Sequence, residues 1–193
     1  MSELRTPRLR LRDWRDADRA PFAALNADPE VMRYFPALGT REGSDRLIDA
    51  WQTQLHERGW SNWAVERLDT AEFIGFVGLT VPGRVLPFTP CVEVGWRLGR
   101  SHWHQGFATE AARAALDVGW RAARLDEIVS FTALGNATSI AVMRRLGMQR
   151  DEGGDFDHPA VPQGSPLQRH CLYRIAAPPR VGGVNRALNS HRR

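Results

Sequence analysis

The residues whose types and spacing best suit a binding or catalytic site lie between Glu93 and Trp120, in the stretch EVGWRLGRSHWHQGFATEAARAALDVGW. A strand-like run there breaks into a loop, and Gly106 then opens a helix whose apolar residues recur at helical spacing: Phe107, Ala111, Ala114, Ala115 and Val118. The first N–H groups of a helix have no intrahelical partner and attract phosphate. Gly106 and the small Ala108 would let a phosphate approach the backbone closely. The spacing therefore predicts a phosphate-binding loop at the start of a helix.

A second motif, NATSIAVMRRLGM, runs from Asn136 to Met148. Asn136 is typical of a helix N-cap, and Gly147 stands where the helix would end. The apolar stripe of this helix consists of Ile140, Met143 and Leu146. The motif predicts a short helix with a polar first turn.

The elements that must position these motifs follow from hydrophobic patterning. We expect strands near Leu9 to Trp14, Asn62 to Leu68, Glu72 to Val81, Cys91 to Leu98, Glu127 to Thr132, Met148 to Asp151 and Gln168 to Ile175. The expected helices run from Ala17 to Asn26, from Arg41 to Arg58, from Gly106 onward, and from Thr138 to Leu146. Strands that alternate with helices predict a single α/β (α+β) domain with a mixed sheet, and the length fits one domain.

The charge of the chain is carried in an unusual way, because all 26 basic residues are Arg and the net charge is +4. Most Arg residues alternate with acids, which argues against nucleic-acid binding. The exception is residues 177–193, rich in Pro, Gly, Asn and Arg, which we expect to form a mobile basic tail after a domain of residues 1–176.

No apolar run approaches the roughly 18–20 residues that cross a membrane, and the opening MSELRTPRLR lacks the apolar segment of a secretion signal. A cytoplasmic protein with no membrane partner is therefore expected. Cys91 and Cys171 are too few for a disulfide framework and are interpreted as two buried free thiols. His102 and His104 are spaced like a metal pair, but no third ligand is evident, so no metal is expected.

The two motifs together resemble a known family. WHQGFATEA followed by NATS and LGM is similar to the GCN5-related N-acetyltransferases (GNAT), and closest to the RimJ/RimL branch of ribosomal-protein N-terminal acetyltransferases. The opening TPRLRLRDWRDAD and the segment ADPEVMRYFP, Ala27 to Pro36, also resemble that branch, so the likeness covers roughly residues 6 to 176. It implies a largely antiparallel sheet that is splayed in the middle for acetyl-CoA as cosubstrate.

The resemblance assigns the pyrophosphate of acetyl-CoA to the loop and helix start, namely Trp103, His104, Gln105, Gly106, Phe107, Ala108 and Thr109. Arg100 is a further charged candidate. The strand that pairs with the pantetheine arm would contain Val94, Gly95, Trp96 and Leu98. One N–H of this strand would polarise the thioester oxygen, and such donors are worth about 3 kcal/mol in acyl transfer. Trp103 stands where the family often has Gln or Arg, which removes one expected polar contact.

Acyl transfer to an amine needs a base that removes a proton from the ammonium form, directly or through water. Glu93 is the first candidate, since it precedes Gly95 by two residues and projects to the same side of the strand. A structural carboxylate paired with an Arg explains Glu93 equally well. Asp155 and Asp157, with His158, are second candidates in a segment where the family builds part of the acceptor pocket, although a polar loop also explains them.

The departing thiolate needs a proton or a hydrogen bond, and the resemblance points to Asn136 for cofactor contact and to Ser139 for contact and catalysis. Helix capping is the alternative explanation of both residues. Many family members use a Tyr as the acid, but Tyr34 and Tyr173 both lie outside the second motif helix, which makes a Tyr acid doubtful.

Acceptor binding is assigned by resemblance to Tyr34 and Phe35, together with Glu93 and Asp157. The other aromatic residues of the first third are expected in the core: Trp14, Trp51, Trp60 and Trp63.

The sequence therefore predicts an acetyl-CoA-dependent N-acetyltransferase that transfers directly to a primary amine, either a small molecule or a protein N-terminus. A covalent route through Cys91 or Cys171 is disfavoured, because neither lies beside a recognisable base. One alternative is a non-catalytic acyl-CoA-binding or sensing domain. Another, an RNA-associated protein, rests on the tail residues Arg180, Arg186, Arg192 and Arg193. A homodimer is left open.

Overall fold

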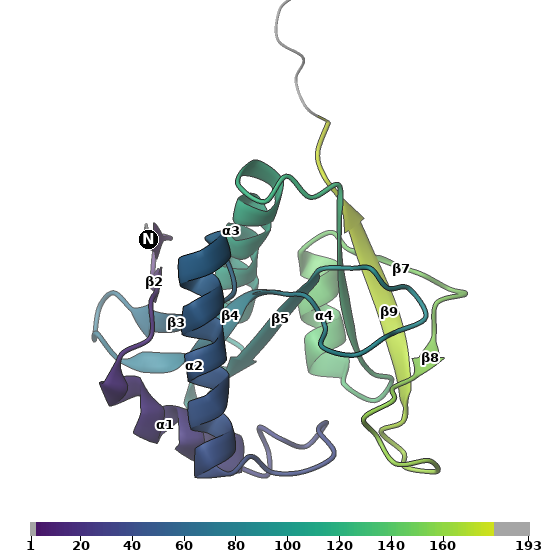
Figure 1. The fold of residues 1–193 in the computed structure, drawn as a ribbon, viewed down its shortest axis with the longest axis horizontal. Coiled ribbons are helices and arrows are strands. Elements are labelled where there is room, and N and C mark those ends of the chain that lie inside the picture. The colour runs from purple at the N-terminus through teal and green to yellow at the C-terminus, as the bar shows by residue number, and fades with distance from the viewer. Residues whose placement is uncertain (1–2, 180–193) are drawn as a thin grey trace, which may run out of the picture.

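The structure is a computed structural model that describes residues 3–179 and shows one α/β domain around a central sheet (Figure 1). The strands are β1 (Leu4–Arg5), β2 (Leu9–Arg12), β3 (Asn62–Arg67), β4 (Phe73–Thr80), β5 (Glu93–Leu98), β6 (Glu127–Ala133), β7 (Gln149–Arg150), β8 (Phe156–Asp157) and β9 (Arg169–Ala176). The helices are α1 (Asp16–Ala27), α2 (Arg41–Arg58), α3 (Phe107–Arg121) and α4 (Ala137–Arg145), with a 3-10 turn, η1 (Arg100–His102). The four tail Arg residues of the RNA-associated alternative lie outside the described residues.

Hydrogen-bonded strands in the described sheet follow the order β1-β2-β3-β4-β5-β6-β9-β7, and β8 pairs with β9. Neighbouring strands are antiparallel except for β5 and β6, which run parallel. A parallel pair needs a crossover connection, and α3 supplies it between β5 and β6. The topology confirms the expected mixed, largely antiparallel sheet.

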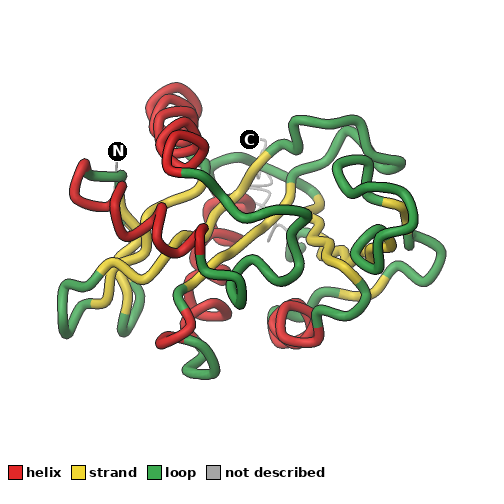
Figure 2. The backbone as a smooth tube through the Cα atoms, turned by 90° about the horizontal axis from the view of Figure 1, so that it is seen from below, coloured by secondary structure: helices red, strands yellow, loops and turns green. Residues whose placement is uncertain are grey.

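Helices cover both faces of the sheet, with α2 on one side and α3 and α4 on the other (Figures 1 and 2). The α1 and α2 side holds an aromatic core whose ring centroids lie 4.7 to 5.9 Å apart: Trp14, Phe22, Trp51, Phe73 and Phe76. On the other side α3 packs closely, because a Cβ atom on Gly119 would lie 2.5 Å from Ile128 Cδ1. The core assignment of Trp14, Trp51 and Trp63 is confirmed by their burial. No helix within residues 3–179 has the length and apolar character that membrane crossing requires.

The N-terminal elements differ from the sequence prediction in their bounds. The first long strand ends at Arg12 rather than at Trp14, and α1 begins at Asp16. The chain turns there because the Asp18 carboxylate accepts a hydrogen bond from the Arg15 N–H at 2.8 Å, and the Trp14 indole N–H donates to the Asn62 carbonyl at 2.9 Å. A local cap and a long-range contact therefore override the simple alternation of apolar residues.

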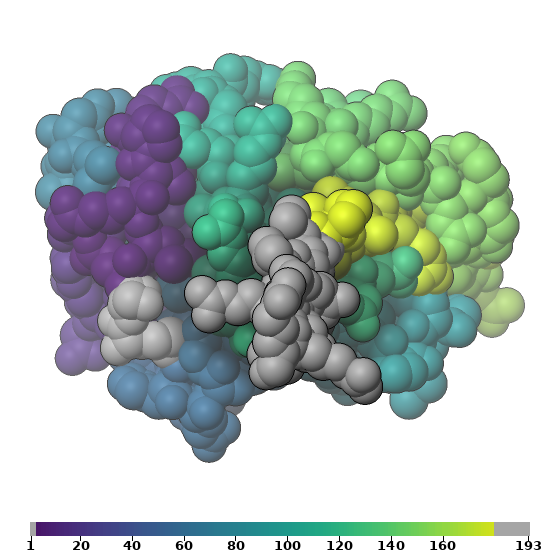
Figure 3. Space-filling view, turned by 90° about the horizontal axis from the view of Figure 1, so that it is seen from above, coloured from purple at the N-terminus to yellow at the C-terminus, as the bar shows by residue number. Residues whose placement is uncertain are grey.

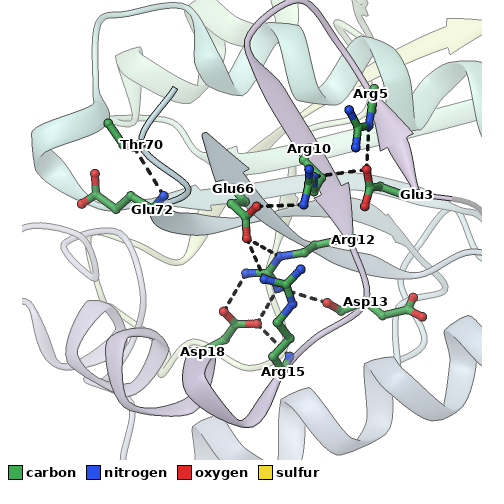
Figure 4. Close-up of polar contacts among 10 residues, drawn as sticks. All are labelled: Glu3, Arg5, Arg10, Arg12, Asp13, Arg15, Asp18, Glu66, Thr70 and Glu72. Carbon is green, nitrogen blue, oxygen red and sulfur yellow. Dashed lines mark hydrogen bonds and ion pairs between the residues drawn. The ribbon is translucent and has the colours of Figure 1, made fainter. Parts of the chain in front are cut away.

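A network of buried charges fixes β2, α1 and β3 to one another (Figure 4). Arg12 donates to both Asp18 carboxylate oxygens at 2.7 and 2.9 Å and to Glu66 Oε2 at 2.7 Å. Arg10 and Arg15 also lie 3.3 and 3.0 Å from the Glu66 carboxylate. Arg12, Asp18 and Glu66 are all buried. Their mutual pairing accounts for these charges without a ligand.

The two cysteines differ in burial. Cys171 is buried as expected, whereas Cys91 is only partly buried, so the prediction of two buried thiols was wrong for Cys91. The reason is local, because Cys91 precedes the first residue of β5 and follows the exposed turn that leads into that strand.

Candidate active site

The parallel strands β5 and β6 separate soon after they meet. Their register joins Glu93 to Val129, and the Val129 N–H donates to the Val92 carbonyl at 2.9 Å. Backbone groups alternate in direction along a strand, so those of Trp96 point to the same side as those of Val92. No further β5–β6 register is formed in the described sheet beyond Glu93 and Val129. The N–H and C=O groups of Trp96 therefore face the gap between the strands.

A large cavity of about 1570 Å³ is lined by residues from both sides of this gap. It exceeds the roughly 300–1,000 Å³ of ordinary small-molecule sites. On the β5 strand its lining includes Glu93, Gly95, Trp96, Arg97 and Leu98. The cavity is thus large enough to hold two reactants against one strand.

The predicted phosphate loop forms one wall of the cavity. Gly106 is the N-cap of α3 and has a left-handed φ of 81°, and His104 has φ 59°. The first α-helical hydrogen bond runs from the Glu110 N–H to the Gly106 carbonyl at 3.0 Å, so the N–H groups of the three residues before Glu110 precede the helical ladder. The Trp103 indole donates to the Leu98 carbonyl at 2.8 Å and ties the loop to β5.

Two further features fit a phosphate group at this wall. Thr109 Oγ1 is buried without a hydrogen-bond partner in the described structure, and Thr109 lines the cavity. A buried hydroxyl without a partner is costly, and a phosphate oxygen would satisfy it. Arg8 Nη2 would lie 3.4 Å from a Cβ atom on Gly106, and Arg8 Nη1 donates to the Gln105 carbonyl at 3.0 Å. The residues present therefore fit a diphosphate.

Sequence reasoning missed Arg8 and chose Arg100 as the nearby cation. Arg8 reaches the loop from the N-terminal segment, which lies beside α3 on the surface in Figure 3, and it pairs with Glu110 at 2.7 Å. Arg100 does not line the cavity and pairs instead with Asp28 at 3.0 Å. No local signal marks Arg8, because almost 100 residues separate it from the loop.

Glu93 lies at the start of β5 and lines the cavity. A Cβ atom on Gly95 would lie 3.9 Å from Glu93 Oε1, which confirms that both residues face the same side. Within residues 3–179 the Glu93 carboxylate has no ion-pair partner, so the interpretation as a paired structural carboxylate was wrong. Burial raises its pKa to about 8. A carboxylate with this pKa suits a base that works near neutral pH.

Asn136 caps α4 as its sequence position predicted. Its Oδ1 accepts the Ser139 N–H at 3.2 Å, and its amide nitrogen donates to Thr132 Oγ1 at 2.9 Å and to Ser139 Oγ at 3.1 Å. Both amide hydrogens are therefore used within the chain, and Oδ1 keeps one lone pair for a ligand. Asn136 and Ser139 both line the cavity.

The segment expected at the acceptor border also reaches the cavity. Tyr34 and Phe35 line it, and the Tyr34 ring would lie 3.8 Å from a Cβ atom on Gly135. Tyr34 therefore approaches the start of α4 through space, although it lies outside that helix in sequence. The motif alone made a Tyr acid doubtful. This proximity makes Tyr34 a candidate for the acid again.

The last acidic candidates are placed elsewhere. Asp157 is exposed and lies 3.3 Å from Arg169, Asp155 pairs with Arg150 at 2.8 Å, and neither lines the cavity. His158 does line the cavity, but burial, with smaller effects of His170 and Arg84, lowers its pKa to about 4. A neutral imidazole with so low a pKa is a weak base. Glu93 is the titratable group best suited to accept a proton.

Not every predicted cofactor residue lines the cavity. Val94 is fully buried in the core, so only its backbone could contribute, and Gln105 is exposed with its side chain bonded to the Ser101 carbonyl at 2.8 Å. The remaining loop and strand candidates named above lie on the cavity wall. Among the described residues, no cluster of three or more His, Cys, Asp or Glu side chains could hold a metal ion.

The two thiols are poorly suited to nucleophilic catalysis. Burial is the main cause that raises the pKa of both Cys91 and Cys171. Neither residue lines the cavity. A thiol with a raised pKa is mostly protonated at neutral pH and is a poor nucleophile.

A helix N-terminus and a splayed pair of strands that line one cavity fit an acyl-CoA-dependent acyltransferase. Residues 8–149 match the acetyltransferase (GNAT) domain family. The chain is 36% identical over 150 residues to the protein YkkB of Bacillus subtilis (strain 168), covering 76% of this chain and 85% of YkkB. It is 29% identical over 178 residues to the N-acetyltransferase YoaA of the same organism, covering 91% of this chain and 97% of YoaA.

The fold is also similar to that of a solved RimL, a ribosomal L7/L12 alpha-N-protein acetyltransferase in complex with coenzyme A. The TM-score is 0.72 at 16% identity, with 91% of this chain and 98% of that chain covered. The chain belongs to the GNAT family of acetyltransferases, and its structural neighbours include the RimL type.

Proposed function

We propose that this protein transfers an acetyl group from acetyl-CoA directly to a primary amine. The observation that carries the proposal is the meeting of three features in one cavity: the open backbone of Trp96, the phosphate-binding start of α3, and the unpaired carboxylate of Glu93. These supply a thioester donor site, a diphosphate anchor and a base.

The steps follow from these groups. The Trp96 N–H donates to the thioester oxygen and stabilises the negative charge that develops there. The amine nitrogen attacks the carbonyl carbon, Glu93 accepts the proton lost from nitrogen, and the carbon–sulfur bond then breaks. The hydroxyl of Ser139 or Tyr34 donates a proton to the leaving sulfur and is itself reprotonated from solvent. No covalent intermediate with the protein is needed.

The acceptor is either a small-molecule amine or a protein N-terminus. The second choice is supported by the likeness to RimL, which is named for the ribosomal protein it acetylates. The cytoplasmic location stays a prediction from the sequence, and a homodimer stays open.

The test is acetyl-CoA binding by calorimetry, followed in the same samples by release of free thiol with a panel of amines and N-terminal peptides. We expect binding together with amine-dependent thiol release. Binding with no release for any amine would favour the sensing alternative, and a lack of binding would refute the proposal.

Asn136 offers a prediction that separates a cofactor contact from a capping role. Asn136→Ser keeps an N-cap acceptor, whereas Asn136→Ala removes it and should lower the free energy of unfolding by about 1 kcal/mol. If Oδ1 also binds the pantetheine arm, both variants should raise KM for acetyl-CoA about 5-fold, as expected for one lost hydrogen bond. Steady-state kinetics and urea unfolding provide the two readouts. A Ser variant with wild-type KM would leave Asn136 with capping alone.

A further inference from the structure

Arg97 is a charged residue of the cavity that the mechanism above does not use. It lies on β5 two residues beyond Gly95, so its side chain shares a face with Gly95 and Glu93. Its Nη1 donates to Asn26 Oδ1 at 2.5 Å, and its guanidinium carbon lies 4.1 Å from the Phe35 ring centroid and 5.5 Å from that of Phe76. The side chain is therefore held in place by a neutral amide and two aromatic rings.

The positive charge of Arg97 has no counterion within residues 3–179. Arg97 forms no ion pair in that part of the chain, and its Nε is buried without a hydrogen-bond partner. Burial lowers its pKa to about 10, so the group is still charged at neutral pH. The contrast with Arg12 is direct, because Arg12 is buried between the carboxylates of Asp18 and Glu66. Arg97 is half-buried, and a cation that is partly withdrawn from water without an anion is costly, a cost that a bound anion would lower.

The phosphates of acetyl-CoA are not suited to be this anion. Val94 lies on the opposite face of β5 and pairs with Leu79 of β4, whose Cδ1 would lie 3.3 Å from a Cβ atom on Gly119 of α3, the helix whose first turn is the proposed phosphate site. Arg97 faces the other way, toward Phe35 and the end of α1. An anion that reaches Arg97 must therefore come from the acceptor side of the cavity.

We propose that Arg97 determines specificity by binding an anionic group, a carboxylate or a phosphate, that is carried by the acceptor amine. This inference rests on the proposed function. Arg97 lies four positions beyond Glu93 on the strand, about 13 Å between their Cα atoms. Gly95 lies between them and has no side chain to obstruct this part of the cavity. The acceptor is thus extended, with its amine near Glu93 and its anionic group at Arg97.

The test compares matched acceptors that differ only in the anionic group, at saturating acetyl-CoA. One set pairs ω-amino acids of increasing length with their amides, a second pairs amino-alcohol phosphates with the free alcohols, and a third pairs short peptides with Glu or Gln near the N-terminus. At least one anionic member should exceed its neutral partner about 10-fold in kcat/KM, mainly through KM, as expected for a charge-assisted hydrogen bond. Equal values across every pair would overturn the proposal.

Variants of Arg97 separate recognition of the anionic group from a structural role in which Arg97 holds the chain around Phe35 in place. Arg97→Gln should abolish the preference while the neutral acceptors keep their kcat/KM, and Arg97→Lys should restore part of it. Arg33→Gln is the matched control, since Arg33 is an exposed cation near the same segment with an Arg33–Glu30 separation of 4.0 Å. A preference that survives in Arg97→Gln, or that is lost in Arg33→Gln, would refute the assignment. Equal losses for anionic and neutral acceptors in Arg97→Gln would show a structural role.

A binding readout keeps this inference separate from the proposed activity. With coenzyme A saturating, the Arg97 side-chain Nε–H resonance, assigned by its loss in Arg97→Lys, is followed by NMR while acetate or inorganic phosphate is added against chloride of equal ionic strength. A saturable shift supports an anion site even if no amine in the panel reacts. A resonance that does not move with either anion would contradict it.

Discussion

Replacing Glu93 by Gln is expected to lower kcat by at least about 100-fold, because general-base catalysis contributes roughly 10²–10⁴-fold. Gln has nearly the same shape but cannot accept the amine proton. Calorimetry should find acetyl-CoA affinity unchanged, since the cofactor is held by α3 and the β5 backbone. Glu30→Gln is the matched control, because Glu30 also lines the cavity but is exposed. A rate within a few-fold of wild type would remove Glu93 from the mechanism.

The pH dependence gives the same assignment a second test. Glu93 is protonated below its pKa of about 8, so kcat/KM should rise as the pH increases through about 8 and then level off. An acceptor amine of low pKa must be used, because its own ionisation then lies outside this window. Glu93→Gln should give a flat profile with that amine. A rise that persists in the variant would assign the titration to another group.

Stability separates loss of catalysis from loss of fold in this variant. The folded-state pKa of Glu93 is raised, so its contribution to stability is largest below the unfolded pKa and falls as the pH rises to about 8. Gln carries no such charge. Glu93→Gln should therefore be at least as stable as wild type at pH 9, measured by urea unfolding.

Glu66→Gln is expected to lower the free energy of unfolding by about 3 kcal/mol, the low end of the cost of breaking a buried ion pair. Arg12 would lose the negative partner that lies 2.7 Å from its Nε, and both side chains are buried. Arg10 and Arg15 would lose the same partner. The neutral amide can still accept one hydrogen bond, which is why the loss is not larger. Urea denaturation at constant ionic strength measures the change.

The control for this variant is Asp69→Asn, which removes an exposed carboxylate that pairs with Arg67. Solvent screens that pair, so stability should barely change. If Glu66→Gln were equally mild, water would have to reach the network in Figure 4 and its role in fixing β2 to α1 would be refuted.

Local patterns were enough to predict much of this protein. The strand, loop and helix around Gly106 follow from apolar spacing and from a residue that tolerates a left-handed φ, here 81°. The cap at Asn136 follows from a side chain that accepts the Ser139 N–H three residues later. Such signals are readable because they depend on neighbours in sequence.

Other features of the site were decided only by the tertiary structure. The separation of β5 from β6, the approach of Arg8 to the phosphate loop and of Tyr34 to Gly135 all join segments that are far apart in the chain. The raised pKa of Glu93 and the unpaired charge of Arg97 depend on which groups surround a side chain, and not on its place in a motif. Desolvation and counterion pairing depend on which residues pack together in three dimensions. The sequence therefore determined the fold and the phosphate loop, while the tertiary structure determined the electrostatics of the site.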